Sequence, residues 1–278
     1  RSILTLKQIL STKLQEHNNS LLYDQFHDRI GEIVLGEVHH IRKQHAILLD
    51  EEGNEFILPK ENQIPSDFYK KGETVRAVIE KVDFKGSKPL IIVSRTSPVF
   101  LEKLLELEIP EIQDGTIMLK KVVRIPGEKA KIAVDAYDDR IDPVGACVGV
   151  KGSRIHGVVR ELRNENIDVI QWSKNPEIMV KRALGNVTIN KIEINIERNY
   201  ALVFTPIEEI SRVIGKQGQN IRLASWLSGF EIDVHREVEG EDVELTEFGD
   251  EIQEWIIKEF TKIGLNTRFC IVIAFNDA

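Results

Sequence analysis

Two short glycine loops are the parts of this sequence whose residue types and spacing best suit chemistry. They are Gly149-Val150-Lys151-Gly152 and Gly215-Lys216-Gln217-Gly218. Glycine has no Cβ, so it allows a sharp turn and lets the backbone come close to a phosphodiester. A helix that follows such a loop points its N–H groups and the positive end of its dipole at the phosphates. The sequence therefore predicts two sites for a single-stranded nucleic acid, each holding about four nucleotides.

Polar side chains at the start of the next predicted helix extend each site. Arg154 follows the first loop, and Asn220 and Arg222 follow the second. Lys151 and Lys216 supply positive charge within the loops themselves. Because cations favour the binding of phosphate oxygens, we expect the four basic side chains to contact RNA, and we expect the amide of Asn220 to do so as well.

The loops occupy equivalent places in an internal repeat. Residues 148–155 align with residues 214–221 at an offset of 66, and the glycines, the preceding aliphatic residue and the following isoleucine coincide. Ile167-Asp168-Val169 then matches Ile232-Asp233-Val234 at an offset of 65. With 18 glycines in the chain, about one G-x-x-G is expected by chance, so the loops alone prove little. Their shared context indicates a duplicated α/β unit.

The elements around the loops follow one order: helix, two strands, helix, loop, helix, strand. The expected ranges are 99–107, 116–125 and 130–137 before the first loop, and 176–184, 188–197 and 200–205 before the second. We expect Asp142 and Pro143 to begin the helix before the first loop. A capping box of Thr205 and Glu208 is expected before the second loop.

A region of predicted β-strands precedes the repeat. Its expected strands are 31–41, 45–50, 55–59, 74–83 and 90–95. Five short strands in so few residues predict a small closed barrel of the OB type. The predicted fold class is therefore α+β multidomain, an OB-type barrel followed by two α/β units.

Barrels of this kind bind single strands through aromatic and basic side chains on one face. The candidates are Phe56, Phe68, Phe84, His45, Lys60 and Arg95, of which we choose Phe56 and Arg95 as RNA-binding residues. His39 and His40 are adjacent in a predicted strand, so we expect them to face opposite sides.

The net charge of −8 does not exclude nucleic acid, because the charge is unevenly distributed. Residues 237–254 contain nine acidic residues and no Lys or Arg. Residues 145–185, which include the first loop, carry seven basic and four acidic residues. The local sign matters more for partner choice than the total.

In this context the two loops resemble tandem KH domains, and the strand region resembles an S1 domain. The S1 resemblance rests on Gly36 and on residues 54–56, 71–73 and 93–95. The order S1, KH, KH resembles the NusA family of bacterial transcription factors over roughly residues 1–260, with residues 94–96, 138–149 and 222–225 as further matching segments.

The resemblance implies a factor that binds the nascent RNA through S1 and both loops and modulates pausing, termination and antitermination. It also implies that RNA polymerase binds the full-length protein through an N-terminal domain, of which residues 1–28 would be the last helix. The expected domains are then 29–97 for S1, 98–185 for the first KH domain, and 186–278 for the second with its acidic helix, 250–263, and its apolar tail, 269–275. We expect the helix to pack on the last KH domain, although a partner surface is the alternative.

Other function classes find little support. The sequence has no P-loop, no G-x-S-x-G elbow and no zinc spacing, so we expect no enzyme activity, no cofactor and no metal. The longest apolar run has seven residues, too few to cross a membrane. Cys147 and Cys270 form no metal or redox pattern, which indicates a reducing compartment, so we expect a cytoplasmic protein. We also expect a monomer. The RNA-binding module of an RNA-processing protein or of a ribosome-associated protein remains the alternative.

Overall fold

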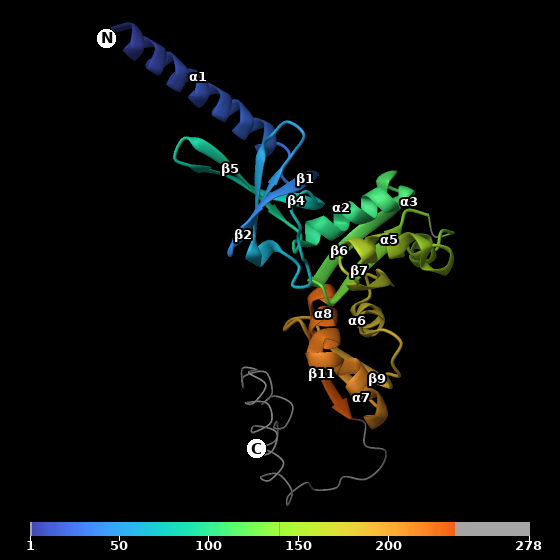
Figure 1. The fold of residues 1–278 in the computed structure, drawn as a ribbon. Coiled ribbons are helices and arrows are strands. Elements are labelled where there is room, and N and C mark those ends of the chain that lie inside the picture. The colour runs from blue at the N-terminus through green and yellow to red at the C-terminus, as the bar shows by residue number, and fades with distance from the viewer. Residues whose placement is uncertain (1, 139, 237–278) are drawn as a thin grey trace, which may run out of the picture. The chain divides into compact units, whose positions relative to one another are not determined.

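The computed structural model describes residues 2–138 and 140–236. The chain divides between Trp172 and Ser173 into two compact units (Figure 1). The acidic stretch 237–254, the predicted helix 250–263 and the apolar segment 269–275 lie outside the described residues.

The first unit contains a closed five-stranded barrel. Its strands are β1 (Ile33–Ile41), β2 (His45–Leu49), β3 (Glu55–Pro59), β4 (Thr74–Lys85) and β5 (Lys88–Ser94), in the order β1-β2-β3-β5-β4. Buried and exposed residues alternate along β1, β2 and β3, as expected when one face of each strand fills a core. The turn of 3₁₀ helix η1 (Lys60–Asn62) follows β3.

A bulge interrupts the first hairpin of the barrel. The register between β1 and β2 shifts between Val38, which pairs with Leu48, and His40, which pairs with Ile47. The rings of His39 and His40 consequently lie 4.2 Å apart between their centroids. The prediction that these two histidines face opposite sides is therefore wrong, because an extra residue in one strand breaks the alternation.

Helix α1 (Ser2–His27) is attached to the barrel at its C-terminal end. Phe26 is buried and meets Phe56 edge to face at 5.5 Å, and Tyr23 stacks on Phe84 at 4.5 Å between ring centroids. Earlier apolar residues of the helix, among them Leu10, are mostly exposed. The aromatic contacts thus fix the end of the helix nearest the barrel.

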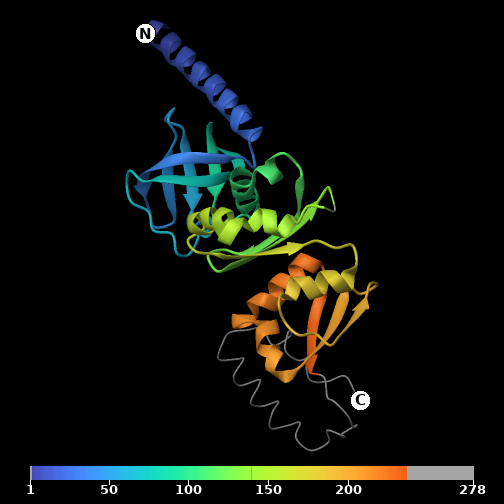
Figure 2. The same ribbon diagram turned by 90° about the vertical axis from the view of Figure 1, so that its right-hand side faces the viewer.

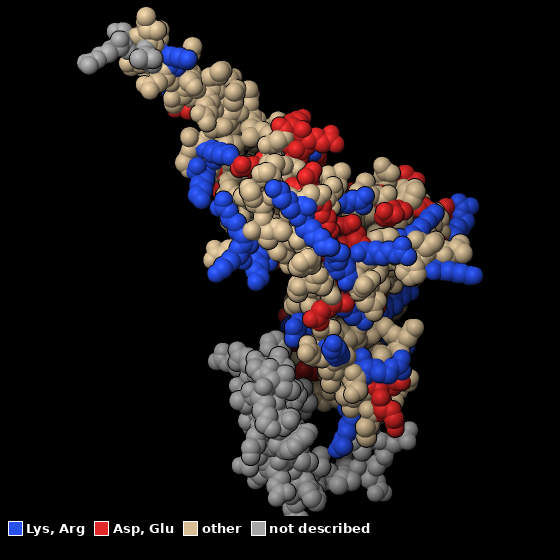
Figure 3. All heavy atoms as spheres, viewed as in Figure 1, with Lys and Arg blue, Asp and Glu red and all other residues tan. Residues whose placement is uncertain are grey.

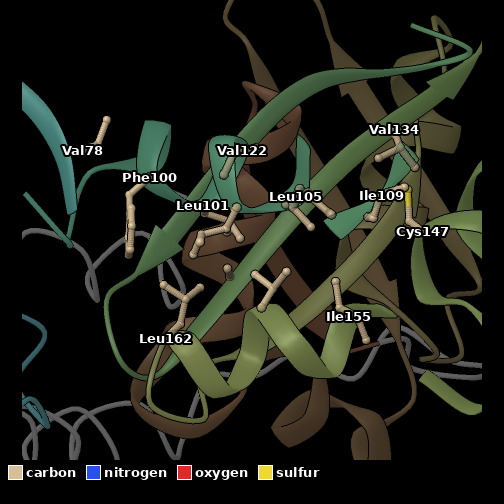
Figure 4. Packing of buried hydrophobic residues seen from close by; sticks show 14 of the residues in the cluster. Val78, Phe100, Leu101, Leu105, Ile109, Val122, Val134, Cys147, Ile155 and Leu162 are labelled. Carbon is tan, nitrogen blue, oxygen red and sulfur yellow. The ribbon is translucent and has the colours of Figure 1, made fainter. Parts of the chain in front are cut away.

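The rest of the first unit is an α/β domain. Its elements are α2 (Pro98–Glu108), α3 (Pro110–Gln113), β6 (Ile117–Ile125), β7 (Lys129–Ala136), α4 (Pro143–Val148), η2 (Val150–Gly152), α5 (Ser153–Glu161) and β8 (Asn166–Gln171). In the sheet, β7 lies between an antiparallel β6 and a parallel β8. Figure 4 shows Phe100, Leu101 and Leu105 of α2 packed with Leu162, at the end of α5, in the core of this domain.

The second unit repeats the same order of elements. They are α6 (Pro176–Leu184), β9 (Lys191–Asn195), β10 (Tyr200–Thr205), α7 (Ile207–Ile214), η3 (Lys216–Gly218), α8 (Gln219–Ser228) and β11 (Glu231–Arg236). Strand β10 again lies between an antiparallel and a parallel neighbour, and the helices lie along one side of the sheet (Figure 2). Helix α6 packs against α8 and β9, although the expected boundary at residue 185 assigned it to the preceding domain.

The two helices before the loops begin differently. The side chain of Asp142 accepts a hydrogen bond from the N–H of Val144, which confirms the predicted cap. At α7, Pro206 holds the N-cap position, and the hydroxyl of Thr205 donates to the carbonyl of Thr188 at 2.6 Å. The predicted capping box is therefore wrong, because Thr205 is buried at the end of β10 and bonds across to another segment.

Candidate nucleic-acid interface

The two glycine loops have the same backbone conformation. The dihedral angles (φ, ψ) of Gly149 and Gly215 are both (73°, 175°). Lys151 and Gln217, the third residue of each loop, lie in the left-handed region at (53°, 30°) and (53°, 28°). The two loops thus adopt the same backbone turn, although the side chains at their middle positions differ.

The first glycine of each loop is required by its surroundings as well as by its positive φ. A Cβ on Gly149 would lie 2.9 Å from Cγ of Arg154. A Cβ on Gly215 would lie 2.6 Å from Cβ of Asn220. At Gly215 any other residue would push the start of α8 away from the loop, because the backbone N of Asn220 would also lie within 3.1 Å. At Gly149 the side chain of Arg154 would have to move, and at both positions glycine allows the close approach.

Arg154 and Asn220 are equivalent residues of the repeat, and both hold the loop in place. Nη1 of Arg154 donates to the carbonyl of Ala146 at 2.8 Å. Nδ2 of Asn220 donates to the carbonyls of Val213 and Leu184 at 3.0 Å each. These carbonyls end helices and would otherwise lack partners, so both side chains join the helix before the loop to the helix after it.

These contacts change the role expected for Arg154 and Asn220. Nη1 of Arg154 also donates to both carboxylate oxygens of Glu111 at 2.8 and 2.9 Å, and this bond lowers the pKa of Glu111. Asn220 is buried. Both were predicted to bind RNA, and the structure shows both supporting the loops. The burial of Asn220 corrects that prediction for this side chain, whereas the Arg154 side chain is 36 % exposed and its contact with RNA stays a prediction.

The side chains at the middle of each loop point into solvent. Val150 is 82 % exposed, and Lys151, Lys216 and Gln217 are also exposed. Each loop thus presents one lysine at the N-terminal end of a helix of nine or ten residues, α5 or α8. Charge, helix dipole and open backbone coincide there, which is the arrangement that binds phosphate.

One further basic position was missed in the sequence. His156 on α5 is equivalent to Arg222 on α8 at the offset of 66, and both side chains are exposed. His156 also lies beside the loop, since a Cβ on Gly152 would meet its ring at 3.5 Å. The alignment of the two repeats could have identified His156, because it pairs this histidine with Arg222, a predicted RNA contact.

Comparisons with known proteins agree with this geometry. Residues 95–172 match the NusA-like first KH domain, and residues 176–242 match the NusA-like second KH domain. The chain is 40 % identical over 243 residues to the transcription termination/antitermination protein NusA of Halalkalibacterium halodurans, an alignment that covers 87 % of this chain. The chain belongs to the NusA family.

Two further relatives carry the same name. The NusA proteins of Thermus thermophilus and Bacillus subtilis are 36 % and 37 % identical to the chain, over 83 % and 86 % of its length. The chain spans 63 %, 60 % and 64 % of the length of the three NusA relatives, respectively. The family and its two KH domains, predicted from the sequence, are thus confirmed.

The two barrel residues chosen as RNA contacts are buried in this NusA-like chain. Phe56 is 1 % exposed and packs inside the barrel. Arg95 is 3 % exposed. Neither side chain can reach RNA in this structure, so both choices are corrected. By contrast, Phe68 and Phe84 are 72 % and 49 % exposed. Phe68 precedes β4, and Phe84 lies near the end of β4, where it stacks on Tyr23.

Arg95 joins the barrel to the first NusA-like KH domain. Its guanidinium donates to the carboxylate of Asp67 at 2.9 Å, to the carbonyl of Arg76 at 2.6 Å, and to the carboxylate of Glu161 at 2.8 Å. Burial alone would lower the pKa of Arg95, but Asp67 and Glu161 raise it above its usual value. The side chain is therefore a charged anchor between the barrel and the end of α5.

A second buried pair lies beside this anchor. Nη2 of Arg124 meets the carboxylate of Glu165 at 2.7 Å, and both side chains are almost completely buried. Nη1 of Arg124 also donates to the carbonyl of Arg95 at 3.0 Å, and Glu165 accepts from the N–H of Gly127 at 2.8 Å. The pair is fully hydrogen-bonded, as a buried ion pair must be if it is to be tolerated.

The part of the chain that the structure describes contains no group of three His, Cys, Asp or Glu side chains placed to hold a metal ion. Within the same residues, no helix has both the length and the apolar character needed to span a bilayer.

Proposed function

We propose that this chain is the RNA-binding portion of a transcription termination/antitermination factor. Each GXXG loop would clamp a short stretch of single-stranded RNA, with phosphates at the loop and at the start of α5 or α8. The observation that carries the proposal is the shared backbone of the two loops, whose exposed residues include Lys151 and Lys216. The names of the three relatives support the role in transcription.

The finer parts of the function extend this proposal. The five-stranded barrel would be an S1 domain within residues 29–97 that contributes to RNA binding, and the nascent transcript would be the RNA. RNA polymerase would bind the full-length protein outside this chain, so that RNA binding here modulates pausing and termination. We propose a cytoplasmic monomer with no catalytic activity.

The loops can be tested one at a time with acidic pairs. Val150→Asp/Lys151→Asp and Lys216→Asp/Gln217→Asp each change the charge of one loop by −3. Aspartate tolerates the left-handed conformation of the third loop residue better than most side chains, and acidic residues near a helix N-terminus stabilise the helix. We therefore expect both variants to fold.

A matched control lies on the turn between β9 and β10. Ile196 is 69 % exposed and Arg198 is exposed, so Ile196→Asp/Arg198→Asp makes the same charge change on another surface. In fluorescence anisotropy with a labelled single-stranded RNA, we expect each loop variant to bind about tenfold more weakly, roughly 1.4 kcal/mol. The control should stay within about twofold of the wild type. Equal losses in the control and the loop variants would show that total charge, and not the loops, decides binding.

A further inference from the structure

In the part of the second unit that the structure describes, the sheet has helices on one face only. Along β10, Ala201 and Val203 are fully buried, and the residues that alternate with them are partly exposed. Helices α6, α7 and α8 all lie on the buried side of the sheet (Figure 2). The other side is the open face, and an apolar stripe of Tyr200, Leu202 and Phe204 runs along its centre.

The first unit does not share this apolar stripe. Tyr200 and Leu202 lie beside the first and third residues of β11, as Lys129 and Lys131 lie beside the first and third residues of β8. Both lysines pair with Asp168, at 2.8 and 2.9 Å. A sheet face in contact with water usually carries polar side chains. Exposed apolar side chains in their place indicate a surface that another segment covers.

One end of the open face, next to Phe204, carries a lysine and a histidine. Nζ of Lys191 lies 5.7 Å from the centre of the Phe204 ring, and the ring of His235 lies 5.8 Å from it. Lys191 also pairs with Glu193, its neighbour on the same face, at 2.6 Å. This end therefore offers cationic and titratable groups beside an aromatic ring.

The opposite end, next to Tyr200, is acidic. Glu231 lies beside Tyr200 in the sheet, and Asp233 accepts a hydrogen bond from the hydroxyl of Tyr200. The surface of the second unit that is visible in Figure 3 carries side chains of both signs. The charge of each face, and not the net charge of the chain, therefore decides what that face binds.

Residues 237–278 follow β11 directly and contain a segment that fits the open face. The sequence predicts a helix over residues 250–263, whose apolar residues recur at helical spacing. They are Ile252, Trp255, Ile256, Phe260 and Ile263. Glu259 lies among them, and Lys262 follows three residues later, at a spacing that favours an ion pair on a helix. A helix of this length spans about 21 Å, and the six residues of β10 span about 20 Å.

The charges of the predicted helix give it a direction on the open face. Acidic residues occupy its first half, at positions 250, 251 and 254, and Lys258 and Lys262 occupy its second half. Strand β11 ends at Arg236, beside the Phe204 end of the stripe. A helix that begins there and runs back along the sheet places its lysines at the acidic Tyr200 end. The thirteen residues 237–249 can span about 40 Å, which is ample for the turn over the sheet.

We propose that residues 250–263 form a helix that docks on the open face of the second KH sheet. Its apolar residues cover the stripe of Tyr200, Leu202 and Phe204, and its lysines lie beside Glu231 and Asp233. The second KH domain thereby gains a third layer, with helices on both faces of its sheet. This inference goes beyond the proposed function, because the open face lies on the side of the sheet opposite to the helices that flank the second loop.

The first test follows the exposure of Trp255 in the full chain. The sequence has three tryptophans, so Trp172→Phe/Trp226→Phe leaves Trp255 as the only one, and circular dichroism checks the fold. Quenching of its fluorescence by acrylamide is compared with that of a synthetic peptide of residues 245–268. We expect the quenching constant to be at least about twofold lower in the chain, because docking buries the large indole ring. A constant equal to that of the peptide would overturn the proposal.

A substitution on the stripe identifies the docking surface. In the same background, Leu202→Asp should shift the docking equilibrium at least about tenfold, because docking would take a carboxylate out of water without a partner. Trp255 should then be quenched as it is in the peptide. Ile207→Asp is the matched control, since Ile207 is 64 % exposed at the start of α7, on the side that carries the helices. If Trp255 stays protected in a folded Leu202→Asp protein, the helix lies elsewhere and the proposal is overturned.

A crosslink tests the direction of the helix by a second route. Glu231→Cys/Lys262→Cys in a Cys270→Ser background introduces two thiols, and Cys147 is buried. With a short bismaleimide, we expect this chain to crosslink internally at least about tenfold faster than Glu208→Cys/Lys262→Cys, because docking raises the effective concentration of one thiol at the other. Glu208 is an exposed residue of α7, so the control moves one thiol to the side of the sheet that carries the helices.

The remaining outcomes separate the chain's own helix from other occupants of the open face. Equal crosslinking rates in the two variants would overturn the proposal. Crosslinks that join two chains, or protection of Trp255 that falls on dilution, would show that the helix docks on a second copy, and the proposal would again be overturned. Neither experiment contains RNA, so failure of the proposed function would leave their results unchanged.

Discussion

Replacing Arg95 by methionine distinguishes a structural anchor from an RNA contact. Methionine keeps much of the apolar stem and removes the guanidinium, which donates to Asp67, Glu161 and the carbonyl of Arg76. The carboxylate of Asp67 is fully buried, so its charge would lose its closest partner inside the protein. We therefore expect the variant to be less stable and its two exposed glycine loops to be unchanged.

The size of the effect follows from what remains around Asp67. Removing one partner of a buried ion pair costs about 3–5 kcal/mol. Asp67 keeps hydrogen bonds from Arg163 at 3.1 Å, from the hydroxyl of Tyr69 at 2.6 Å, and from the N–H of Ile64 at 3.1 Å. Because these bonds still stabilise the carboxylate, we expect the lower end of the range, about 3 kcal/mol.

Urea unfolding followed by circular dichroism measures this loss, and RNA anisotropy under folding conditions measures affinity. Arg76→Met is the matched control, since the side chain of Arg76 is exposed and its loss should change the free energy of unfolding by less than about 0.5 kcal/mol. An Arg95→Met protein that unfolds like the wild type but binds RNA tenfold more weakly would refute the structural role.

Three further predictions concern the loops and the core. Gly215→Ala should lower the free energy of unfolding in urea more than Gly218→Ala does. Both residues have positive φ, but only Gly215 would bring a Cβ to within 2.6 Å of Asn220. Equal losses would mean that the start of α8 moves aside freely. Asn220→Ala should lower stability by about 1–3 kcal/mol, because it leaves two helix-ending carbonyls without their donor, and RNA affinity should fall with it; unchanged stability would contradict this role. In a Cys270→Ser background, Cys147 should react with a thiol reagent at pH 8 only after denaturation, since burial and the nearby Glu111 raise its pKa to about 11; rapid reaction of the native protein would contradict its burial.

The sequence was most informative where local chemistry decides local structure. The glycines of both loops, the cap at Asp142 and the helix Pro176–Leu184 were found because each depends on neighbouring residues alone. The strands of the barrel were placed within a few residues, because alternation of apolar and polar residues reflects a face buried in a core. The repeat also predicted that both KH domains share one order of elements.

Predictions failed where residues distant in the sequence determine the environment. Phe56 and Phe68 look alike in a sequence, but only the barrel shows that one fills the core and the other is exposed. The role of Arg95 depends on Asp67 and Glu161, which are 28 and 66 residues away. The bulge at His39 was not foreseen either, because the irregularity arises from pairing with β2.

The most direct test of the central proposal is the RNA affinity of a protein with both loops made acidic. The variant combines Val150→Asp, Lys151→Asp, Lys216→Asp and Gln217→Asp. Circular dichroism checks its folding, and fluorescence anisotropy with single-stranded RNA is recorded at two salt concentrations. We expect a folded protein with affinity at least about a hundredfold lower and with a shallower salt dependence, since the lysine contacts with phosphate are gone. A folded variant that binds RNA as the wild type does, with the same salt dependence, would contradict the proposal.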